Sequence, residues 1–572
     1  MMRALQLVRL FFRVCWHRGI RTAWLMAAEK LAPRRRLGSR RSPFEYGRSN
    51  AAAYLSALKK KPLITVVVPV LDSPYLDETI ASVTAQSYPH FELILVDDAS
   101  GDPAAQACRS AAARDERIRC LRNDTNRGIS RATNRGCAAA RGEYIALLDH
   151  DDLLHPDALA QVARAANAHP EADILFTDEL RIGPRGAVLE ITRKCDPSET
   201  LLLSCNSILH LCVMRKSAFE NLGGMDPAFD GAQDHDLMLR AFDGGLAFQH
   251  IPCVLYAWRI HGRSMSHASA RTPQDRTASP AYRAGKACIE AYLARKGIEA
   301  SVTDEARPWY RVRFAVPRPD ERVAVVVPFK DGGPLLERLL AGLRKTLTPG
   351  VRIYLVDNAS SLPETREFLD GLAQDPAIRI LSHDRPFNFS RLHNEIVAGL
   401  DEEILVFLNN DVEVISEDWL SAMREHVHRD RVAAVGCALR RRNGDLAHAG
   451  IVLQLSNREP CARNLAFERG FYTRVQREVS AVSAACMMVR RSAFLAVGGF
   501  DETEFPVGFS DVDLCLRLGK AGYRIVYTPH AEFYHDESAS RGVCCEDYET
   551  GALLQRYLGD SPVLDRHYKT VW

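Results

Sequence analysis

The chain has 572 residues, of which 47% are hydrophobic and 26% charged, and a formal net charge of +2. This length exceeds what one hydrophobic core supports, and the near-neutral charge argues against nucleic acid as the main partner. The fifteen cysteines show no C-x-x-C spacing, which favours reduced thiols over a disulfide framework or a zinc site. No apolar run approaches the roughly 18–20 residues that cross a bilayer.

Residues 1–61 form a basic, amphipathic N-terminal segment with fifteen Lys or Arg residues and two acids. Apolar residues recur at helical spacing between Ala4 and His17, while Arg9 and Arg13 interrupt the run and argue against a cleavable signal peptide. One interpretation is an interfacial helix in peripheral contact with an anionic membrane, which gains about 1 kcal/mol per basic residue near the surface. The alternative is a helix that packs on the body of the same protein.

The chain then alternates β-branched apolar runs with segments of helical spacing. This alternation predicts an α/β fold with a parallel, doubly wound sheet. A G-x-G-x-x-G turn is absent, which disfavours a dinucleotide dehydrogenase. Ser130 is a candidate cap for the helix that opens near Asn126. The strands are expected over 63–70, 91–98, 118–122, 144–149, 173–178, 211–215 and 256–260, and the helices over 76–86 and 103–117, from 126 and from 233.

Carboxylates cluster where two of these strands end. The run from Tyr144 ends in Asp149, Asp151 and Asp152, and the earlier run from Phe91 ends in Asp97 and Asp98. Ligands of open α/β sheets lie just outside the carboxyl ends of the strands. Clustered carboxylate oxygens suit a hard divalent cation such as Mg2+ or Mn2+. Such a cluster can equally be a solvated turn or a helix cap.

An internal repeat separates these interpretations, because a solvated turn has little reason to repeat its acids. Its spacing is about 260 residues over the early motifs and about 275 over the later ones, so the chain holds two copies of one domain. The matched segments are Val66–Pro69 with Val325–Pro328, Leu95–Ser100 with Leu355–Ser360, Asp149–Asp151 with Asn409–Asp411, Asp234 and Asp236 with Asp511 and Asp513, and His261 with His535. The expected domains are 62–290 and 321–545, joined by an extended linker at 291–320 and followed by a tail at 546–572.

The repeated motifs resemble family 2 of the glycosyltransferases, the inverting nucleotide-sugar enzymes with the GT-A fold. The resemblance rests on VVVPV, LVDDAS, DHDD, QDHDLMLR and HGRSMS in the first copy, and on VVVPF, LVDNAS, LNNDVEV, FSDVDLCLR and YHDESASRG in the second. The second set is similar to the motifs that tandem bacterial O-antigen and capsule transferases carry. The resemblance as a whole implies two tandem GT-A domains, each with a Rossmann-like, mostly parallel sheet.

The resemblance also implies a role for each repeated residue. A divalent cation, Mg2+ or Mn2+, would be bound by Asp149 and Asp151 in the first copy and by Asp411 in the second, where Asn409 replaces the first acid. Asp234 and Asp511 would be the general bases, while Asp236 and Asp513 either hold the loop or cap the helix. The residues expected to face the donor are Pro69, Asp97, Asp98, Asp149, His261, Pro328, Asp357, Asn409 and His535.

The expected activity is the metal-dependent transfer of sugars, with one site per domain. The donor would be a UDP-, dTDP- or GDP-sugar, and the acceptor a glycan or lipid-linked glycan of a growing surface polysaccharide. The expected location is the cytoplasm, peripheral on the inner face of the cytoplasmic membrane. One alternative is a single catalytic domain beside a degenerate glycan- or nucleotide-binding domain. Another is a sugar nucleotidyltransferase, which would release pyrophosphate.

Overall fold

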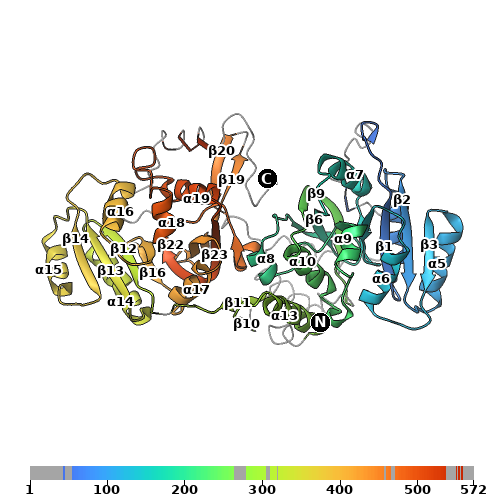
Figure 1. Cartoon of the computed structure of the whole chain (residues 1–572), viewed down its shortest axis with the longest axis horizontal. Coiled ribbons are helices and arrows are strands. Elements are labelled where there is room, and N and C mark those ends of the chain that lie inside the picture. Colours follow the sequence, from blue (N-terminus) through green and yellow to red (C-terminus); the bar gives the residue numbers. More distant parts are fainter. Residues whose placement is uncertain are drawn as a thin grey trace, which may run out of the picture. The chain divides into compact units, whose positions relative to one another are not determined.

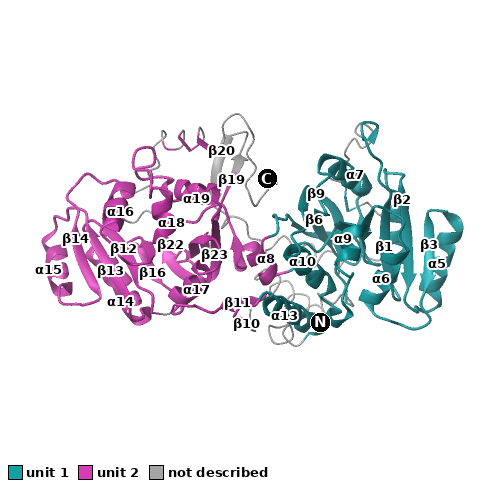
Figure 2. Cartoon of the chain, in the orientation of Figure 1, with its two compact units in different colours: residues 1–197, 206–296, 304–308 teal, residues 198–205, 297–303, 309–572 magenta. Residues whose placement is uncertain are grey.

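A computed structural model describes residues 43–44, 55–262, 279–303, 309–318, 320–456, 459–464 and 471–535, with a few residues between 549 and 557. The chain divides into two compact units (Figure 2). Unit 1 comprises 1–197, 206–296 and 304–308, and unit 2 comprises 198–205, 297–303 and 309–572. We call the sheet and helices of unit 1 the first domain and those of unit 2 the second domain. The helix expected between Ala4 and His17 lies outside the described residues.

The first domain is built on a nine-stranded sheet in the order β3-β2-β1-β4-β8-β6-β9-β5, with β7 paired to β6 (Figure 1). Its strands are β1 (Ile64–Val70), β2 (Phe91–Asp97), β3 (Ile118–Arg122), β4 (Tyr144–Leu147), β5 (Leu153–Leu154), β6 (Ile174–Ile182), β7 (Val188–Thr192), β8 (Cys212–Arg215) and β9 (Phe248–Arg259). Its helices are α4 (Leu76–Thr84), α5 (Asp102–Arg114), α6 (Ile129–Ala139), α7 (Ala158–Ala168), α9 (Lys216–Asn221), η1 (Pro227–Phe229), α10 (Gln233–Asp243) and α13 (Pro280–Arg295).

The second domain repeats this sheet in the order β14-β13-β12-β15-β22-β17-β23-β16, with β18 paired to β17 and β21 to β23. Its strands are β12 (Val323–Phe329), β13 (Val351–Asp357), β14 (Ile378–Ser382), β15 (Ile404–Leu408), β16 (Val412–Val414), β17 (Val432–Arg440), β18 (Leu446–His448), β21 (Arg477–Glu478), β22 (Cys486–Arg490) and β23 (Arg524–His535). Its helices are α14 (Gly333–Thr346), α15 (Pro363–Leu372), α16 (Phe389–Ala398), α17 (Trp419–Val427), η3 (Phe471–Arg474), α18 (Arg491–Ala496) and α19 (Ser510–Lys520). The remaining elements of unit 2 are α8 (Glu199–Ser204) and two hairpins, β10 (Ala300–Thr303) with β11 (Arg311–Phe314), and β19 (Ile451–Ser456) with β20 (Glu459–Asn464).

The predicted α/β fold with two tandem domains is confirmed. Strands β3, β2, β1 and β4 are parallel, and strand β8 joins β4 in the antiparallel sense. The sequence of β1, ITVVVPV, is almost wholly buried, as expected of a central strand with helices on both faces. The chain leaves β1 toward β2 on one side and returns on the other side as β4. This reversal opens a crevice at the carboxyl ends of β1 and β4.

Two details differ from the sequence-based expectations. Ser130 does not cap α6, because Gly128 holds the cap position and the Ser130 hydroxyl instead donates to Asp230. Strand β6 runs on to Ile182, so the segment Thr177–Glu179 lies buried inside the strand and not at its end. No helix in the described part of the chain combines the length and apolarity needed to cross a membrane.

Candidate active sites

A pocket in the first domain brings together three of the predicted site residues. Pro69 at the end of β1, Asp149 after β4 and Asp234 in the first turn of α10 all line it. Met225, from the loop that precedes η1, completes one wall. The predicted metal-binding acid and the predicted base therefore face one cavity, although 85 residues separate them in the sequence.

The carboxylates of this pocket repel one another. Burial, together with the nearby charges of Asp151 and Asp234, raises the pKa of Asp149 to about 7. Burial also raises the pKa of Asp234, although its Oδ2 accepts a hydrogen bond of 2.9 Å from Nδ2 of Asn206. A cation placed among these groups would relieve the repulsion, so the charge distribution fits a divalent metal ion.

His261 lies beside Asp151, one of the predicted metal ligands. Its Nε2 is 2.6 Å from Oδ2 of Asp151. In the second domain His535 ends β23, directly opposite Val412 of β16. Its Nε2 is 3.5 Å from Oδ1 of Asp411. Each domain therefore joins a histidine from its last long strand to an aspartate that follows its fourth strand.

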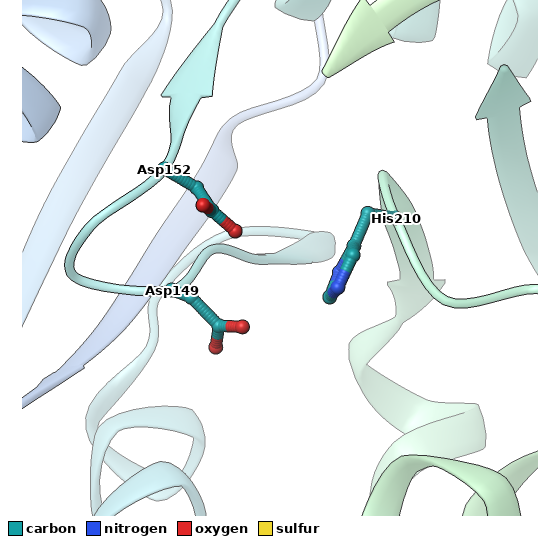
Figure 3. A group of neighbouring side chains, drawn as sticks. All are labelled: Asp149, Asp152 and His210. Carbon is teal, nitrogen blue, oxygen red and sulfur yellow. The ribbon is translucent and has the colours of Figure 1, made fainter. Parts of the chain in front are cut away.

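Two other polar residues lie at this point: Asp152, to which sequence analysis gave no separate role, and His210, which it missed. Asp152 and His210 converge with Asp149, and one ligand atom from each lies within 4.8 Å of the others (Figure 3). Burial lowers the pKa of His210 to about 4, so its ring is neutral and retains a lone pair. Asp152 directly follows Asp149-His150-Asp151, and this position was a signal for it. His210 belongs to no sequence motif, so the sequence gave no signal for it.

Asp152 nevertheless acts mainly as a support. Its Oδ2 accepts from the Tyr256 hydroxyl over 2.6 Å and its Oδ1 accepts from the backbone N–H of Arg259 over 2.7 Å. Both oxygens are thus engaged in tying the loop after β4 to β9. By this argument Asp149 and Asp151 keep the more available oxygens, which agrees with the predicted D-x-D pair.

In the second domain the base candidate Asp511 opens α19. Its Oδ2 accepts from the backbone N–H of Ala484 over 2.9 Å, and burial raises its pKa. The same loop donates the N–H of Ser483 to Nε2 of His448, 3.3 Å away, and Ala485 accepts from the N–H of Asn409 over 3.1 Å. The loop before β22 therefore contacts both the base and the segment that carries Asp411.

Asp411 has an orphaned oxygen. Its carboxylate is nearly buried, and Oδ1 makes no hydrogen bond within the described part of the second domain, with only the His535 ring 3.5 Å away. A buried anionic oxygen without a donor is costly unless a cation neutralises it. This oxygen therefore fits a metal ligand. Asn409, two residues earlier, is partly exposed at the end of β15.

Asp236 and Asp513 each pair with an arginine of their own helix. Asp236 pairs with Arg240 over 2.6 Å, and Asp513 pairs with Arg517 over 2.7 Å, one helical turn away in each case. Arg240 also donates to the carbonyl of Gly224 over 2.8 Å, which fixes the double-glycine turn to α10. The loop-holding alternative therefore describes both residues.

The residues predicted to face the nucleoside are Asp98, which holds a loop, and four residues at or near the ends of strands. Asp98 is buried and accepts from the backbone of Arg127 and Gly128 and from Asn123 Nδ2, at 2.6–3.0 Å, so its oxygens hold the loop before α6. Asp97 and its counterpart Asp357 end β2 and β13. Pro69 contributes its carbonyl, 3.1 Å from Nδ1 of His150, and Pro328 is buried near the end of β12.

Comparison with known proteins agrees with the repeat. The chain is 38% identical over 526 residues to the protein y4gI of Sinorhizobium fredii, covering 90% of this chain and 57% of that protein. It is 39% identical over 497 residues to the O-antigen biosynthesis protein RfbC of Myxococcus xanthus, covering 85% of this chain and 38% of that protein. It is 31% identical over 257 residues to a pre-mycofactocin glycosyltransferase of Mycobacterium tuberculosis, covering 43% of this chain and 48% of that protein. The chain thus spans between about two fifths and three fifths of the length of these relatives.

The family comparison matches twice, once in each domain. Residues 65–185 and 324–498 both match the family described as glycosyl transferase family 2. The two matches contain the strands and acids from which the first part of each site is built. The chain belongs to glycosyl transferase family 2.

Proposed function

We propose that each domain is an inverting, metal-dependent transferase that moves a sugar from a nucleotide-sugar donor to a growing surface polysaccharide. The observation that carries the proposal is that Asp149, the candidate metal ligand, and Asp234, the candidate base, line one pocket. The repeated positions of Asp411 and Asp511 extend it to the second domain. The proposed catalytic domains are 62–290 and 321–545.

A divalent cation fits both sites. Asp149, Asp151 and His261 would hold it in the first domain, and Asp411 with His535 and the carbonyl of Asn409 would hold it in the second. Mg2+ or Mn2+ is the expected ion, because the ligands are mainly hard oxygens. When bound, such an ion neutralises negative charge on the departing diphosphate.

The base residues act on the acceptor. Asp234 or Asp511 would accept the proton of the acceptor hydroxyl while its oxygen forms a bond to the anomeric carbon and the bond to the diphosphate breaks. Attack from the face opposite the leaving group inverts the anomeric configuration. The raised pKa of each carboxylate favours proton uptake near neutral pH, since a base works best when its pKa lies close to the working pH.

The substrates follow from this chemistry and from the relatives. The donor would be a UDP-, dTDP- or GDP-sugar, and the acceptor a glycan or lipid-linked glycan. The printed name of the Myxococcus xanthus relative supports a surface polysaccharide of the O-antigen type. We place the reaction in the cytoplasm, at the inner face of the cytoplasmic membrane.

Paired substitutions in the full chain test the proposal. Asp234→Asn and Asp511→Asn each remove one base without changing side-chain size, and each should lower formation of its own linkage by about 10²–10⁴-fold. The measurement is release of nucleoside diphosphate from a nucleotide-sugar panel, with linkage analysis of the product. Asp370→Asn, at an exposed aspartate of α15, is a matched control that should change neither linkage.

Asn409 favours a second candidate, in which the second domain only binds the glycan or nucleotide. In that case Asp511→Asn would leave every linkage intact while Asp234→Asn abolishes turnover. Release of pyrophosphate instead of nucleoside diphosphate would contradict both candidates and indicate a nucleotidyltransferase.

A further inference from the structure

The carboxyl ends of β2 and β13 differ at one neighbouring residue. Asp97 and Asp357 occupy these ends, and Oδ1 of each accepts from the backbone N–H of the serine three residues later, over 2.8 Å and 2.9 Å. The next parallel strand places Arg122 opposite Asp97 and Ser382 opposite Asp357. One register position therefore carries a cation in the first domain and a hydroxyl in the second.

Arg122 occupies the carboxylate beside it. Its Nη1 hydrogen-bonds Oδ2 of Asp97, and its Nη2 donates to the carbonyl of Ser100 over 3.0 Å. The Asp97 side chain is only 1% exposed, whereas the Arg122 side chain is 46% exposed. The surface at this strand end is thus a guanidinium, and both oxygens of the acid are engaged beneath it.

Asp357 keeps an open acceptor. Within the described residues of the second domain no side chain is bonded to its Oδ2, and the residue is partly exposed. Ser382 is too short to reach across as Arg122 does. The second domain therefore presents an anionic acceptor where the first presents cationic N–H groups.

This difference bears on the nucleoside of the donor. In doubly wound sheets the ligand lies outside the carboxyl ends of the strands, and an acid after the second strand accepts a hydrogen bond from the nucleoside. Resting on the function proposed above, we propose that Arg122 and Ser382 set the nucleoside selectivity of the two domains. The Asp357 carboxylate takes a hydrogen-bond donor of the nucleoside, either a ribose hydroxyl or a ring N–H, whereas Arg122 withdraws Asp97 from that role.

The size of the effect follows from the charge of the acceptor. A hydrogen bond to an ionised group is stronger than one between neutral groups, and its loss lowers affinity by about 10–100-fold. The second domain should therefore discriminate against nucleotides that lack the donor group. The first domain should tolerate its absence, because its acid is already paired.

Reciprocal exchange in the full chain tests this inference. Asp411→Asn or Asp151→Asn is added so that each titration with Mn2+ reports on one domain. The probes are UDP, 2′-deoxy-UDP, CDP and GDP, measured by calorimetry. CDP lacks the ring N–H of UDP and 2′-deoxy-UDP lacks the hydroxyl, so the two probes distinguish the sources of the donor.

The expected result is a preference of about tenfold or more for UDP over CDP or over 2′-deoxy-UDP in the second domain. Ser382→Arg should remove that preference, and Arg122→Ser should create it in the first domain. Asp357→Asn, which adds no bulk, should remove it as well, while Arg109→Ser, an exposed arginine on α5, should have no effect. If the chain binds the nucleotides but no variant changes the affinity ratio of UDP to CDP or to 2′-deoxy-UDP by more than twofold, this inference alone is overturned. Failure of the unsubstituted chain to bind any of the four probes would overturn the proposed function too.

Discussion

The two domains hold their candidate bases at the same place by different means. In the first domain the amide of Asn206 donates to Asp234, and in the second the backbone N–H of Ala484 donates to Asp511, each over 2.9 Å. Both donors lie in the loop that precedes the strand antiparallel to the metal-bearing strand. The comparison teaches that this loop supplies a donor to the carboxylate in both domains, while the position and the chemical group of that donor are free to change.

The candidate metal sites of the two domains differ in charge. The first domain offers Asp149 and Asp151, and the second offers Asn409 and Asp411 in the same positions after the fourth strand. The histidine from the last long strand is retained in both, at 2.6 Å from its aspartate in the first domain and 3.5 Å in the second. The second site thus keeps its architecture with one negative charge fewer.

A third difference lies inside the sheet, on β6 and β17. Both strands pair with the strand that carries the pocket-forming loop, and the register makes Asp178 the counterpart of the buried Ala438. Asp178 is fully buried and accepts from His250 over 2.9 Å and from Arg193 over 3.0 Å. The first domain therefore uses a buried ionic cluster where the second uses apolar packing.

Breaking that cluster should give the largest effect on stability. Asp178→Ala leaves the buried His250 and the partly exposed Arg193 without their partner and should destabilise the first domain by about 3–5 kcal/mol. Leu439→Ala, at the buried neighbour of Ala438, removes only packing and should cost the second domain about 2–5 kcal/mol, depending on how far the cavity collapses. Urea unfolding followed by peptide-resolved hydrogen exchange separates the two domains. A loss below 1 kcal/mol for Asp178→Ala would show that the ionic cluster is dispensable.

Restoring the missing acid should sharpen the metal comparison. Asn409→Asp gives the second domain the D-x-D pair of the first and should tighten Mn2+ binding there by about tenfold, since hard cations prefer anionic oxygens. The measurement is Mn2+ titration by electron paramagnetic resonance, with Asn443→Asp on an exposed turn as the control. Unchanged affinity would mean that position 409 does not contact the ion.

The smallest expected effect concerns the support of the first base. A hydrogen bond to the ionised carboxylate lowers its pKa, so Asn206→Leu should raise the pKa of Asp234 further. The acidic limb of the pH profile of kcat/KM for the first linkage should then move to higher pH by about one unit. The second linkage, made with Asp511, serves as the internal control and should not move. A shift in both profiles, or in neither, would contradict a positioning role for Asn206.

Much of this architecture could be read from residues that are close in the chain. Continuous β-branched apolar residues predict buried strands such as Ile64–Val70, and the spacing of apolar residues predicts the helices. The repeat showed which acids recur, so Asp234, Asp411 and Asp511 could be assigned before any coordinates. These signals survive because a strand or a helix start is specified within a few neighbouring residues.

Only the tertiary structure showed which carboxylates are already engaged. Asp97 and Asp98 are adjacent, yet one meets Arg122 across the sheet and the other holds the loop before α6. Asp152 is tied to Tyr256, 104 residues away, and His210 reaches the pocket from a loop with no motif of its own. Such partners are chosen by strand order and register, which bring distant segments together. The sequence by itself therefore determined the two-domain plan and the recurrent acids, whereas the folded contacts decided which of those acids remain free to bind or react.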